Sequence, residues 1–221
     1  MSDIPTTTDF KRPTKEMVER FRKCYVAAIS DAMDNLGVLN CIVPASVIKP
    51  LIPGTKIAGT AITMKVASAR TIGPVPHRLS SVFDGEAGDI PVIDNGGRLR
   101  IVAWGGGLTG RAIKKGLEGM ILDGCTRDAA DIIGQGFPMW VRGVSPQTSR
   151  KRTETIAINQ PIEIAPDVGG VQVRAGDIIV ADDDGIAVIP LDRAEEVLVE
   201  AERIVNREAQ RDVATATGAA V

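Results

Sequence analysis

The sequence predicts one mixed α/β domain. Helical spacing of apolar residues appears near both ends of the chain, and glycine-bounded strands alternate with short helices in its middle. After residue 137 the chain turns to clustered short strands separated by Gly, Pro or Asp turns. The 221 residues suffice for one well-buried core. No change in composition indicates a linker, so we expect a single domain over 1–221, with about 13 residues at the N-terminus and about 7 at the C-terminus flexible.

The first predicted helix covers residues 14–36. Thr14 is suited to cap it, Glu16 lies in its first turn, and Gly37 can end it in a left-handed conformation. The polar residues at 30–34 are interpreted as a solvated helix face rather than a functional cluster. Apolar residues recur along this helix at Met17, Phe21, Tyr25, Ala28 and Met33.

The segment 59–66 alternates polar and apolar residues, which is typical of a half-buried strand. The other elements follow from short apolar runs and from the glycines that end them. Predicted strands cover 89–94, 101–104, 119–122, 138–142, 156–158, 161–164, 171–173, 177–181 and 185–189, and predicted helices cover 108–116, 128–134 and 191 to about 214.

Composition excludes several classes of protein. Aromatic residues make up only 3% of the chain, and 26 basic residues face 28 acidic ones, so neither base stacking nor a basic surface indicates nucleic-acid binding. The first 15 residues lack the apolar core of a secretion signal, and no apolar stretch is long enough to span a membrane. Three widely spaced cysteines form no CxxC pair. We therefore expect a cytoplasmic protein without disulfides.

A nucleophilic cysteine is the first catalytic hypothesis to weigh. Cys125 lies beside the charged motif described below, but His77 is the only histidine in the chain and no orienting partner is evident for it. A small buried cysteine is the commoner situation, and we favour that interpretation.

The most informative local feature is the glycine loop 104–110, Trp-Gly-Gly-Gly-Leu-Thr-Gly, which follows a strand and opens a helix. Free N–H groups at a helix N-terminus favour a carboxylate or phosphate. A simple chain reversal is the alternative. The loop also fits the dinucleotide pattern Gly105-x-Gly107-x-x-Gly110, with Asp123 ending the next strand. That interpretation is disfavoured, because clustered strands follow instead of further strand–helix repeats.

A charged pair, Arg127-Asp128, ends a tight turn that begins at Asp123, just after the buried strand 119–122. The planar guanidinium of Arg127 suits a carboxylate and an adjacent keto oxygen. Asp128 offers hard oxygen ligands of the kind that Mg²⁺ prefers. Together they suit a 2-oxo acid whose carbonyl is polarised by a metal. An ion pair, or a helix cap by Asp128, is the alternative that the residues leave open.

At this point the residues resemble a known family. Gly106, twenty residues, Arg127-Asp128, two residues and Asp131 are similar to the Gly–x20–Arg–Asp–x2–acid pattern of the RraA-like proteins. That family includes the 4-hydroxy-4-methyl-2-oxoglutarate / 4-carboxy-4-hydroxy-2-oxoadipate aldolases. The resemblance covers roughly 18–212. Further matching stretches lie at 30–37, 59–63, 119–124, 169–182 and 184–190.

The resemblance implies a compact α/β/β swivelling fold of the phosphohistidine-domain-like type, with N- and C-terminal helices. It also implies a lyase that cleaves a 4-hydroxy-2-oxo acid to pyruvate, with Mg²⁺ (or Mn²⁺) as cofactor and with oxaloacetate decarboxylase activity. Relatives assemble as homotrimers or hexamers with sites between subunits. The implied substrate contacts are Gly105, Gly106, Gly107, Leu108 and Arg127, the metal ligand is Asp128, and Glu208 of a neighbouring subunit would act on the metal through water.

The chain departs from the aldolase pattern at two positions. Aldolase relatives often carry an acid where this chain has Gly106 and a leucine where it has Gly107, which bears on the choice of aldol substrate more than on the oxo-acid site. The rival function within the family is a non-catalytic regulator that binds ribonuclease E. Such regulators tend to replace the aspartate after the arginine, so Asp128 favours the enzyme. A methyltransferase is disfavoured by the β-rich second half.

Overall fold

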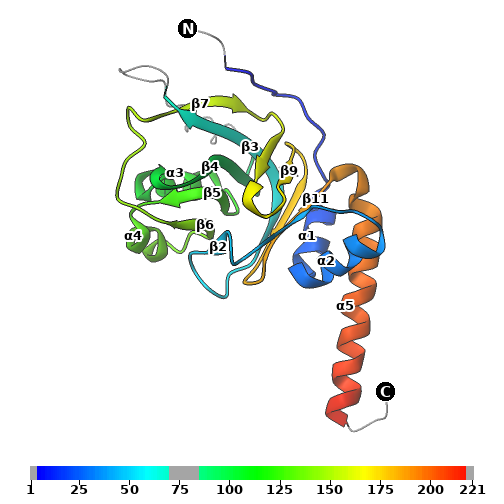
Figure 1. The fold of residues 1–221 in the computed structure, drawn as a ribbon. Helices are drawn as coiled ribbons and strands as arrows, with labels where there is room; N and C mark the ends of the chain where they lie inside the picture. Colours follow the sequence, from blue (N-terminus) through cyan, green and yellow to red (C-terminus); the bar gives the residue numbers. More distant parts are fainter. Residues whose placement is uncertain (1–3, 70–84, 218–221) are drawn as a thin grey trace.

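The computed structural model describes residues 4–69 and 85–217 as a mixed α/β protein with helices near both ends (Figure 1). The predicted fold class is confirmed. The strands are β1 (Ile42–Pro44), β2 (Lys49–Pro50), β3 (Ile57–Ser68), β4 (Asp89–Trp104), β5 (Met120–Thr126), β6 (Met139–Val144), β7 (Thr153–Ile158), β8 (Ile162–Ile164), β9 (Val171–Val173), β10 (Ile178–Ala181) and β11 (Gly185–Ile189). The helices are α1 (Lys15–Lys23), α2 (Val26–Asn35), α3 (Gly106–Lys115), α4 (Ala129–Gly134) and α5 (Ala194–Thr217).

Among the described residues, nine strands form one sheet in the order β1-β11-β10-β3-β4-β5-β6-β2, with β7 paired to β3. The central strands β3, β4, β5 and β6 are parallel, and the flanking strands are antiparallel. A separate hairpin joins β8 and β9. Because β4, β5 and β6 run the same way, the loops that follow them meet at one edge of the sheet, which is where ligands bind in open parallel sheets.

The two faces of the sheet are covered differently. Alternate residues of a strand point to opposite faces. Ala58 and Ile62 of β3 pack with helices, whereas Ile57 and Ala61 pack with the β8–β9 hairpin. On the helical face, α1, α2 and α5 cover β10 and β11, and α3 and α4 cover β4 and β5. The layers are therefore helices, sheet and hairpin, the α/β/β order that the family resemblance implies.

The single helix predicted for 14–36 is wrong, because the structure divides it into α1 and α2. Thr14 caps α1 as expected, accepting the Met17 N–H at 3.1 Å. Cys24 then takes an extended conformation, and a new helix begins at Val26, whose N–H donates to the Asp182 carboxylate at 2.8 Å. A helix N-terminus needs such acceptors for its free N–H groups. The acceptor that restarts the helix comes from 156 residues further along the chain.

The two strands predicted at 89–94 and 101–104 are one strand, β4, with an irregular middle. Its pairing to β5 shifts register between Asp94 and Arg98 and again before Val102. Gly96 and Gly97 both have a φ of +64°, which lets the chain bulge without strain. The Asn95 side chain closes the bulge by donating to the Ile101 carbonyl at 3.0 Å. The bulge brings the second half of β4 back beside β5, where β4 leads into α3.

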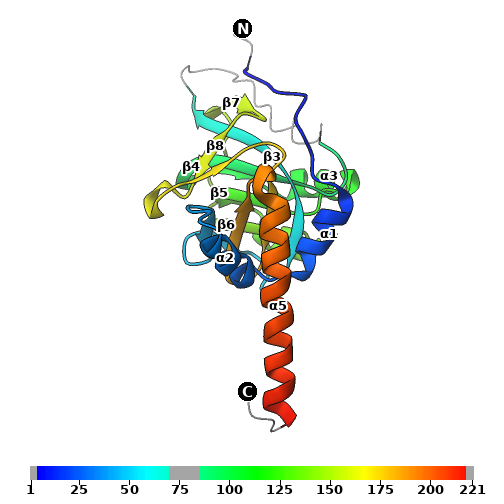
Figure 2. The ribbon, with the colours of Figure 1, turned by 90° about the vertical axis from the view of Figure 1, so that its right-hand side faces the viewer.

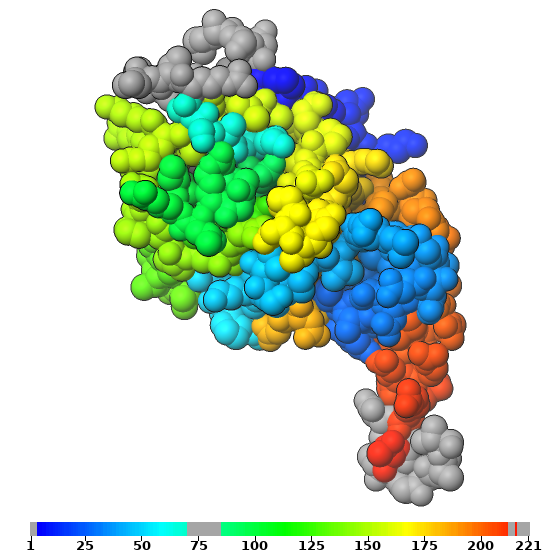
Figure 3. All heavy atoms as spheres, viewed as in Figure 1, coloured from blue at the N-terminus to red at the C-terminus, as the bar shows by residue number. Residues whose placement is uncertain are grey.

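Helix α5 extends well beyond the body of the molecule (Figures 2 and 3). Its first half packs on α1 and α2 through Val197, Leu198, Ala201 and Ile204. No helix within the described residues combines the length and apolar character that a membrane span requires. At the other end of the chain, Thr7 donates its N–H to the Ile158 carbonyl at 3.2 Å, so the N-terminal segment runs along β7.

Candidate functional site

The turn after β5 sets the direction of both charged residues of the motif. Thr126 ends the strand fully buried, and the Arg127 N–H donates to the Trp104 carbonyl at 3.1 Å, which ties the turn to the end of β4. Asp128 takes a left-handed conformation with a φ of 57° and a ψ of 38°. Aspartate tolerates this conformation better than most residues. The kink aims the Asp128 carboxylate across to α3 instead of along its own helix α4.

The Asp128 carboxylate lies at the N-terminus of α3. Gly105, the residue before α3, has no side chain to cap the helix, and the Gly106 N–H donates instead to Asp128 Oδ2 at 3.2 Å. Leu108 donates to the Gly105 carbonyl at 3.0 Å. Helix geometry leaves the Gly107 N–H without an acceptor inside the helix, so it remains able to bind an anion. The structure thus brings together the glycine loop and the charged pair, as predicted.

The ion pair that the sequence left open is present. Arg127 Nε lies 3.5 Å from Asp128 Oδ2, and both side chains are 45% exposed. An exposed pair of this kind contributes little to stability, about 0–1 kcal/mol. Asp128 precedes α4 but makes no side-chain hydrogen bond to it, so the helix-cap alternative applies to α3 and not to α4. Neither group is buried by the pairing, and both remain accessible to a ligand.

Two of the three glycines lie close to charged side chains. A Cβ on Gly105 would lie 2.9 Å from Asp128 Oδ2 and 3.1 Å from Arg127 Cγ. A Cβ on Gly106 would overlap the Asp131 carboxylate, whereas a Cβ on Gly107 would meet nothing within 4 Å. A side chain at position 106 would therefore require the Asp131 carboxylate to move. The carboxylate of Asp131, from the next helix, occupies that space.

A cavity of about 200 Å³ opens between these elements. The glycine loop, the charged pair and two hydroxyl residues after β6 all line it. Its lining residues are Val102, Ala103, Trp104, Gly105, Gly107, Leu108, Arg127, Asp128, Thr148 and Ser149. The buried Trp104 is fixed by donating its indole N–H to Thr109 Oγ1 at 2.9 Å, so this wall of the cavity is rigid.

The donor set is compatible with a hard divalent ion. The Asp128 carboxylate accepts the Gly106 N–H, and the Asp131 carboxylate lies against the same residue. Within the described residues no group of three or more His, Cys, Asp or Glu side chains forms a metal-binding cluster. Mg²⁺ commonly takes one or two protein carboxylates and keeps several waters, so the residues present suit it better than zinc, which needs three or four protein ligands.

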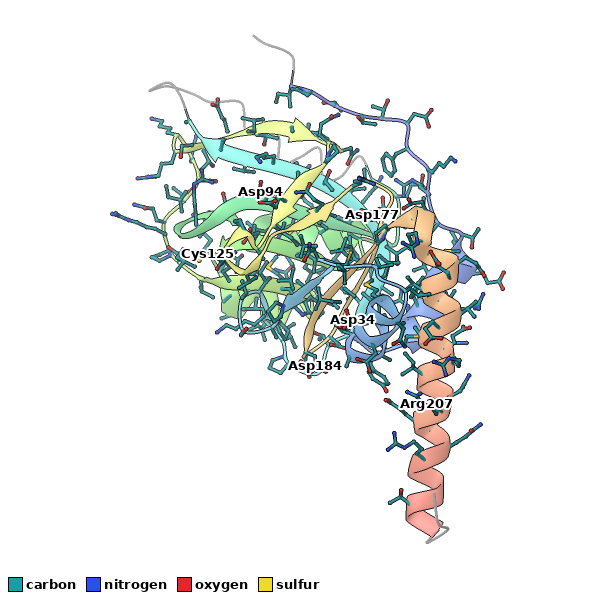
Figure 4. All side chains as sticks on the ribbon, turned by 45° about the vertical axis from the view of Figure 1, so that its right-hand side comes forward. Asp34, Asp94, Cys125, Asp177, Asp184 and Arg207 are labelled. Atoms are coloured by element: carbon teal, nitrogen blue, oxygen red, sulfur yellow. The ribbon has the colours of Figure 1, made fainter. Side chains whose placement is uncertain are left out.

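Two alternatives from the sequence are not supported by the geometry. Asp123 is fully buried, pairs with Arg142, and accepts the Ala165 N–H at 3.0 Å, so it is not available to bind a ribose. Cys125 lies among the strands (Figure 4), donates to the Leu99 carbonyl at 3.3 Å, and has a pKa raised by burial. Such a thiol is a poor nucleophile. His77, the proposed partner of Cys125, lies outside the described residues.

Glu208 is not brought to the site within one chain. It lies on α5, next to Arg207, which Figure 4 shows on the part of the helix that leaves the body. Helix α5 packs over β10 and β11, at the other end of the sheet from β5 and α4. The role assigned to Glu208 belongs to a neighbouring subunit, and it stays a prediction.

Sequence reasoning missed Thr148 and Ser149, which line the same cavity as Arg127. The only available signal was their position after the last of the parallel strands, β6, in a segment that the sequence leaves without an element. Asp131 was noted only as part of a motif. Its contact with Gly106 depends on how α3 and α4 pack, and no spacing in the sequence reveals it.

The fold and site define a class of protein: an α/β/β molecule in which a helix N-terminus and a carboxylate lie together at the carboxyl edge of a parallel sheet. The sequence profile of the RraA-like family, described as Aldolase/RraA, matches residues 26–188. The chain belongs to the RraA-like family.

Named relatives come from both branches of the family. The chain is 35% identical over 188 residues to a putative 4-hydroxy-4-methyl-2-oxoglutarate aldolase of Halalkalibacterium halodurans. The matched region covers 85% of this chain and 83% of that protein. It is 32% identical over 183 residues to Protein DlpA of Legionella pneumophila, covering 82% of this chain but only 29% of DlpA. The crystal structure of Streptomyces coelicolor RraAS2, described as an unusual member of the RNase ES inhibitor RraA protein family, superposes with a TM-score of 0.81 at 26% identity, covering 91% of this chain and 99% of that one.

Proposed function

We propose that the protein is a divalent-metal-dependent lyase that cleaves a 4-hydroxy-2-oxo acid of the 4-hydroxy-4-methyl-2-oxoglutarate type to pyruvate. The observation that carries the proposal is the Asp128 carboxylate held at the α3 N-terminus, beside the Arg127 guanidinium and inside one cavity. Relatives named as putative aldolases support the class of reaction.

The chain's own groups bind the pyruvoyl end of the substrate. The Arg127 guanidinium donates two parallel hydrogen bonds to a carboxylate in the geometry that this side chain favours. The N–H groups at the start of α3 add a positive partial charge on the same side. The substrate carboxylate is thereby held against the glycine loop, which leaves the 2-oxo group facing Asp128.

Asp128 would hold the metal, with Asp131 beside it. When bound, Mg²⁺ or Mn²⁺ would polarise the 2-oxo group and stabilise negative charge on its oxygen. Arg127 acts in the same direction, because its positive charge lies where the enolate develops. In the lyase reaction the C3–C4 bond breaks and its electron pair forms the pyruvate enolate. The C4 hydroxyl loses its proton and becomes the carbonyl of the second product, and protonation at C3 then gives pyruvate.

Decarboxylation of oxaloacetate needs the same enolate, so we expect it as a second activity. There the bond to the distal carboxylate breaks, CO₂ leaves, and the electron pair again forms the pyruvate enolate. The reaction uses no group at the hydroxyl-bearing carbon. It is therefore less sensitive than the aldol cleavage to the absence of an acid at position 106.

The test is pyruvate release from 4-hydroxy-4-methyl-2-oxoglutarate and from oxaloacetate, with Mg²⁺, with Mn²⁺ and with a chelator. We expect metal-dependent turnover of both. Arg127→Lys keeps the charge but loses the planar fork, and we expect kcat/KM to fall about tenfold to a hundredfold. Turnover of neither substrate by the metal-loaded protein would refute the proposed function.

A non-catalytic inhibitor of a ribonuclease E-type enzyme is the second candidate. The likeness to RraAS2 over nearly the whole chain favours it. The accessible Asp128 and Arg127 within a cavity favour the lyase, because an inhibitor has no need of that site. Adding the protein to a ribonuclease E cleavage assay distinguishes the two functions: slowed RNA cleavage together with no lyase turnover would support the inhibitor.

A further inference from the structure

A second cavity lies at the opposite edge of the sheet from the glycine loop. It has a volume of about 440 Å³ and lies between α1 and the residues that precede β4 and β5. The two ends of β5, a strand of 7 residues, are roughly 20 Å apart, because a strand rises about 3.3 Å per residue. The cavity shares no lining residue with the one at the glycine loop, so it is a separate feature of the molecule.

A buried hydroxyl without a partner faces this second cavity. Alternate residues of a strand point to the same side, so Thr60 of β3 points to the helical face together with Ala58 and Ile62. Thr60 is only 7% exposed and lines the cavity, and within residues 4–69 and 85–217 its hydroxyl makes no hydrogen bond. Buried polar groups are almost always hydrogen-bonded, so this hydroxyl indicates a polar ligand.

Two arginines hold the sides of the cavity in place. Arg12 donates to both oxygens of the buried Asp89, at 2.6 and 3.1 Å. Arg22 donates to the Glu118 carboxylate and, at 2.8 Å, to the Ala58 carbonyl. Both guanidinium groups are thus engaged with the protein itself. The cavity therefore has its shape before a ligand arrives, which lowers the cost of binding.

The groups that remain for a ligand carry opposite charges. Lys15 lines the cavity, is exposed, and forms no ion pair in the described part of the chain. It is the first residue of α1, where the helix dipole adds partial positive charge. Glu86 and Glu118 each pair with an arginine, but a carboxylate can accept further hydrogen bonds. The Gly88 N–H donates at 2.8 Å to Gly116, at the negative end of the α3 dipole.

This mixture of charges favours a zwitterionic ligand. A purely anionic ligand would face the carboxylates of Glu86 and Glu118, and a purely cationic ligand would face the ammonium group of Lys15. A molecule with one group of each charge pairs with both sides of the cavity. Apolar surface between them suits an aliphatic side chain. Part of the lining is apolar: Pro13, Val18 and Ala87.

We propose that this cavity binds an α-amino acid with a branched aliphatic side chain. The ligand carboxylate pairs with Lys15 at the start of α1. The ligand ammonium group pairs with Glu118 and donates to the Thr60 hydroxyl, because both lie beside Asp89: Thr60 is its partner across the sheet, and the Glu118 N–H donates to its carbonyl at 3.0 Å. The inference does not depend on the lyase proposal, because it concerns a different cavity and is tested by binding alone.

The test is calorimetric titration of the full chain with L-leucine and with two analogues that each lack one charge. 4-Methylpentanoate lacks the ammonium group, and 3-methylbutylamine lacks the carboxylate. We expect L-leucine to bind and each analogue to bind at least about tenfold more weakly, because each analogue loses hydrogen bonds to a charged group. No binding of L-leucine at millimolar concentration, or an analogue that binds as tightly, would overturn the inference.

Substitutions test the residues that we assign to this cavity. Thr60→Val replaces an unpaired hydroxyl by a methyl group, so the ligand-free protein should keep its melting temperature while L-leucine affinity falls about tenfold. Thr60→Ser should restore the affinity. Lys15→Gln should also weaken binding about tenfold, and Lys23→Gln, an exposed lysine at the other end of α1, is its matched control and should bind like the wild type. Unchanged L-leucine affinity in Thr60→Val or Lys15→Gln would refute the assignment.

Discussion

The replacement of Asp128 by asparagine isolates the charge of the proposed metal ligand. Asparagine adopts the left-handed conformation of Asp128, φ 57° and ψ 38°, as readily as aspartate does. Its amide oxygen can still accept the Gly106 N–H, which lies 3.2 Å from Oδ2 in the wild type. Asp128→Asn therefore keeps the backbone and the helix cap but removes one negative charge from the site.

Asp128→Asn should change the metal affinity of the protein much more than its stability. Loss of a residue that only supports a metal ligand typically weakens binding 10- to 100-fold, so loss of the ligand itself should cost about 100-fold or more, or roughly 2.7 kcal/mol. The stability of the metal-free protein should change by less than about 1 kcal/mol. Asp128→Ala differs, because left-handed alanine costs about 1–2 kcal/mol and the loss of a charge-assisted hydrogen bond costs about 1.5 kcal/mol more. We therefore expect the free energy of unfolding of this variant to fall by about 2.5–3.5 kcal/mol.

Calorimetric titration with Mn²⁺ measures the metal affinity, and urea unfolding in the presence of a chelator measures the stability of the metal-free protein. Asp31→Asn is the matched control, because it removes the same charge from an exposed position on α2. Unchanged Mn²⁺ affinity in Asp128→Asn would refute the ligand role. An Asp128→Ala variant as stable as Asp128→Asn would refute the argument from backbone conformation.

Three further predictions follow from particular contacts. Gly105→Ala should displace the Asp128 carboxylate and weaken Mn²⁺ binding, because its Cβ would lie 2.9 Å from a carboxylate oxygen. In Gly107→Ala the added Cβ meets nothing within 4 Å, so we expect this variant to be more stable than the wild type by up to about 1 kcal/mol and to melt at a higher temperature; equal melting temperatures of the two proteins would contradict this. Asp123→Asn leaves the buried Arg142 partly unpaired and should destabilise the fold by about 3 kcal/mol in urea unfolding, and a loss below about 1 kcal/mol would count against a structural role. Hydrogen bonds from Arg142 lower the pKa of Asp167 from 3.8 to about 2, so the stability from this pair is present above pH 3.8 and is lost as the pH falls through about 2. The difference in melting temperature between the wild type and Asp167→Asn should therefore shrink as the pH falls from 3.8 to about 2. A difference that stays constant over this range would exclude the pairing.

Much of the secondary structure could be predicted from local pattern. Helical spacing and the Thr14 cap placed the start of α1. Alternation placed β3, but the half-buried strand expected there is wrong: β3 is buried on both faces, because helices cover one face of the sheet and the β8–β9 hairpin covers the other. The pairing of the glycine loop with Arg127-Asp128 was also predictable, since each follows a strand of one parallel sheet. The break between α1 and α2 was not, because the carboxylate that caps Val26 comes from Asp182.

By itself, the sequence determined a mixed α/β domain and part of the chemistry of the site: a helix N-terminus, a guanidinium and a carboxylate. The α/β/β layers were implied by the resemblance to the RraA-like family. Only the tertiary structure decided that Asp131 fills the space beside Gly106, that Asp128 caps α3 and not its own helix, and that Thr148 and Ser149 close the cavity. The physical reason is that periodicity and capping act over a few residues. Contacts between loops depend on how whole strands pair and how the helices pack on them, and neither is written in local spacing.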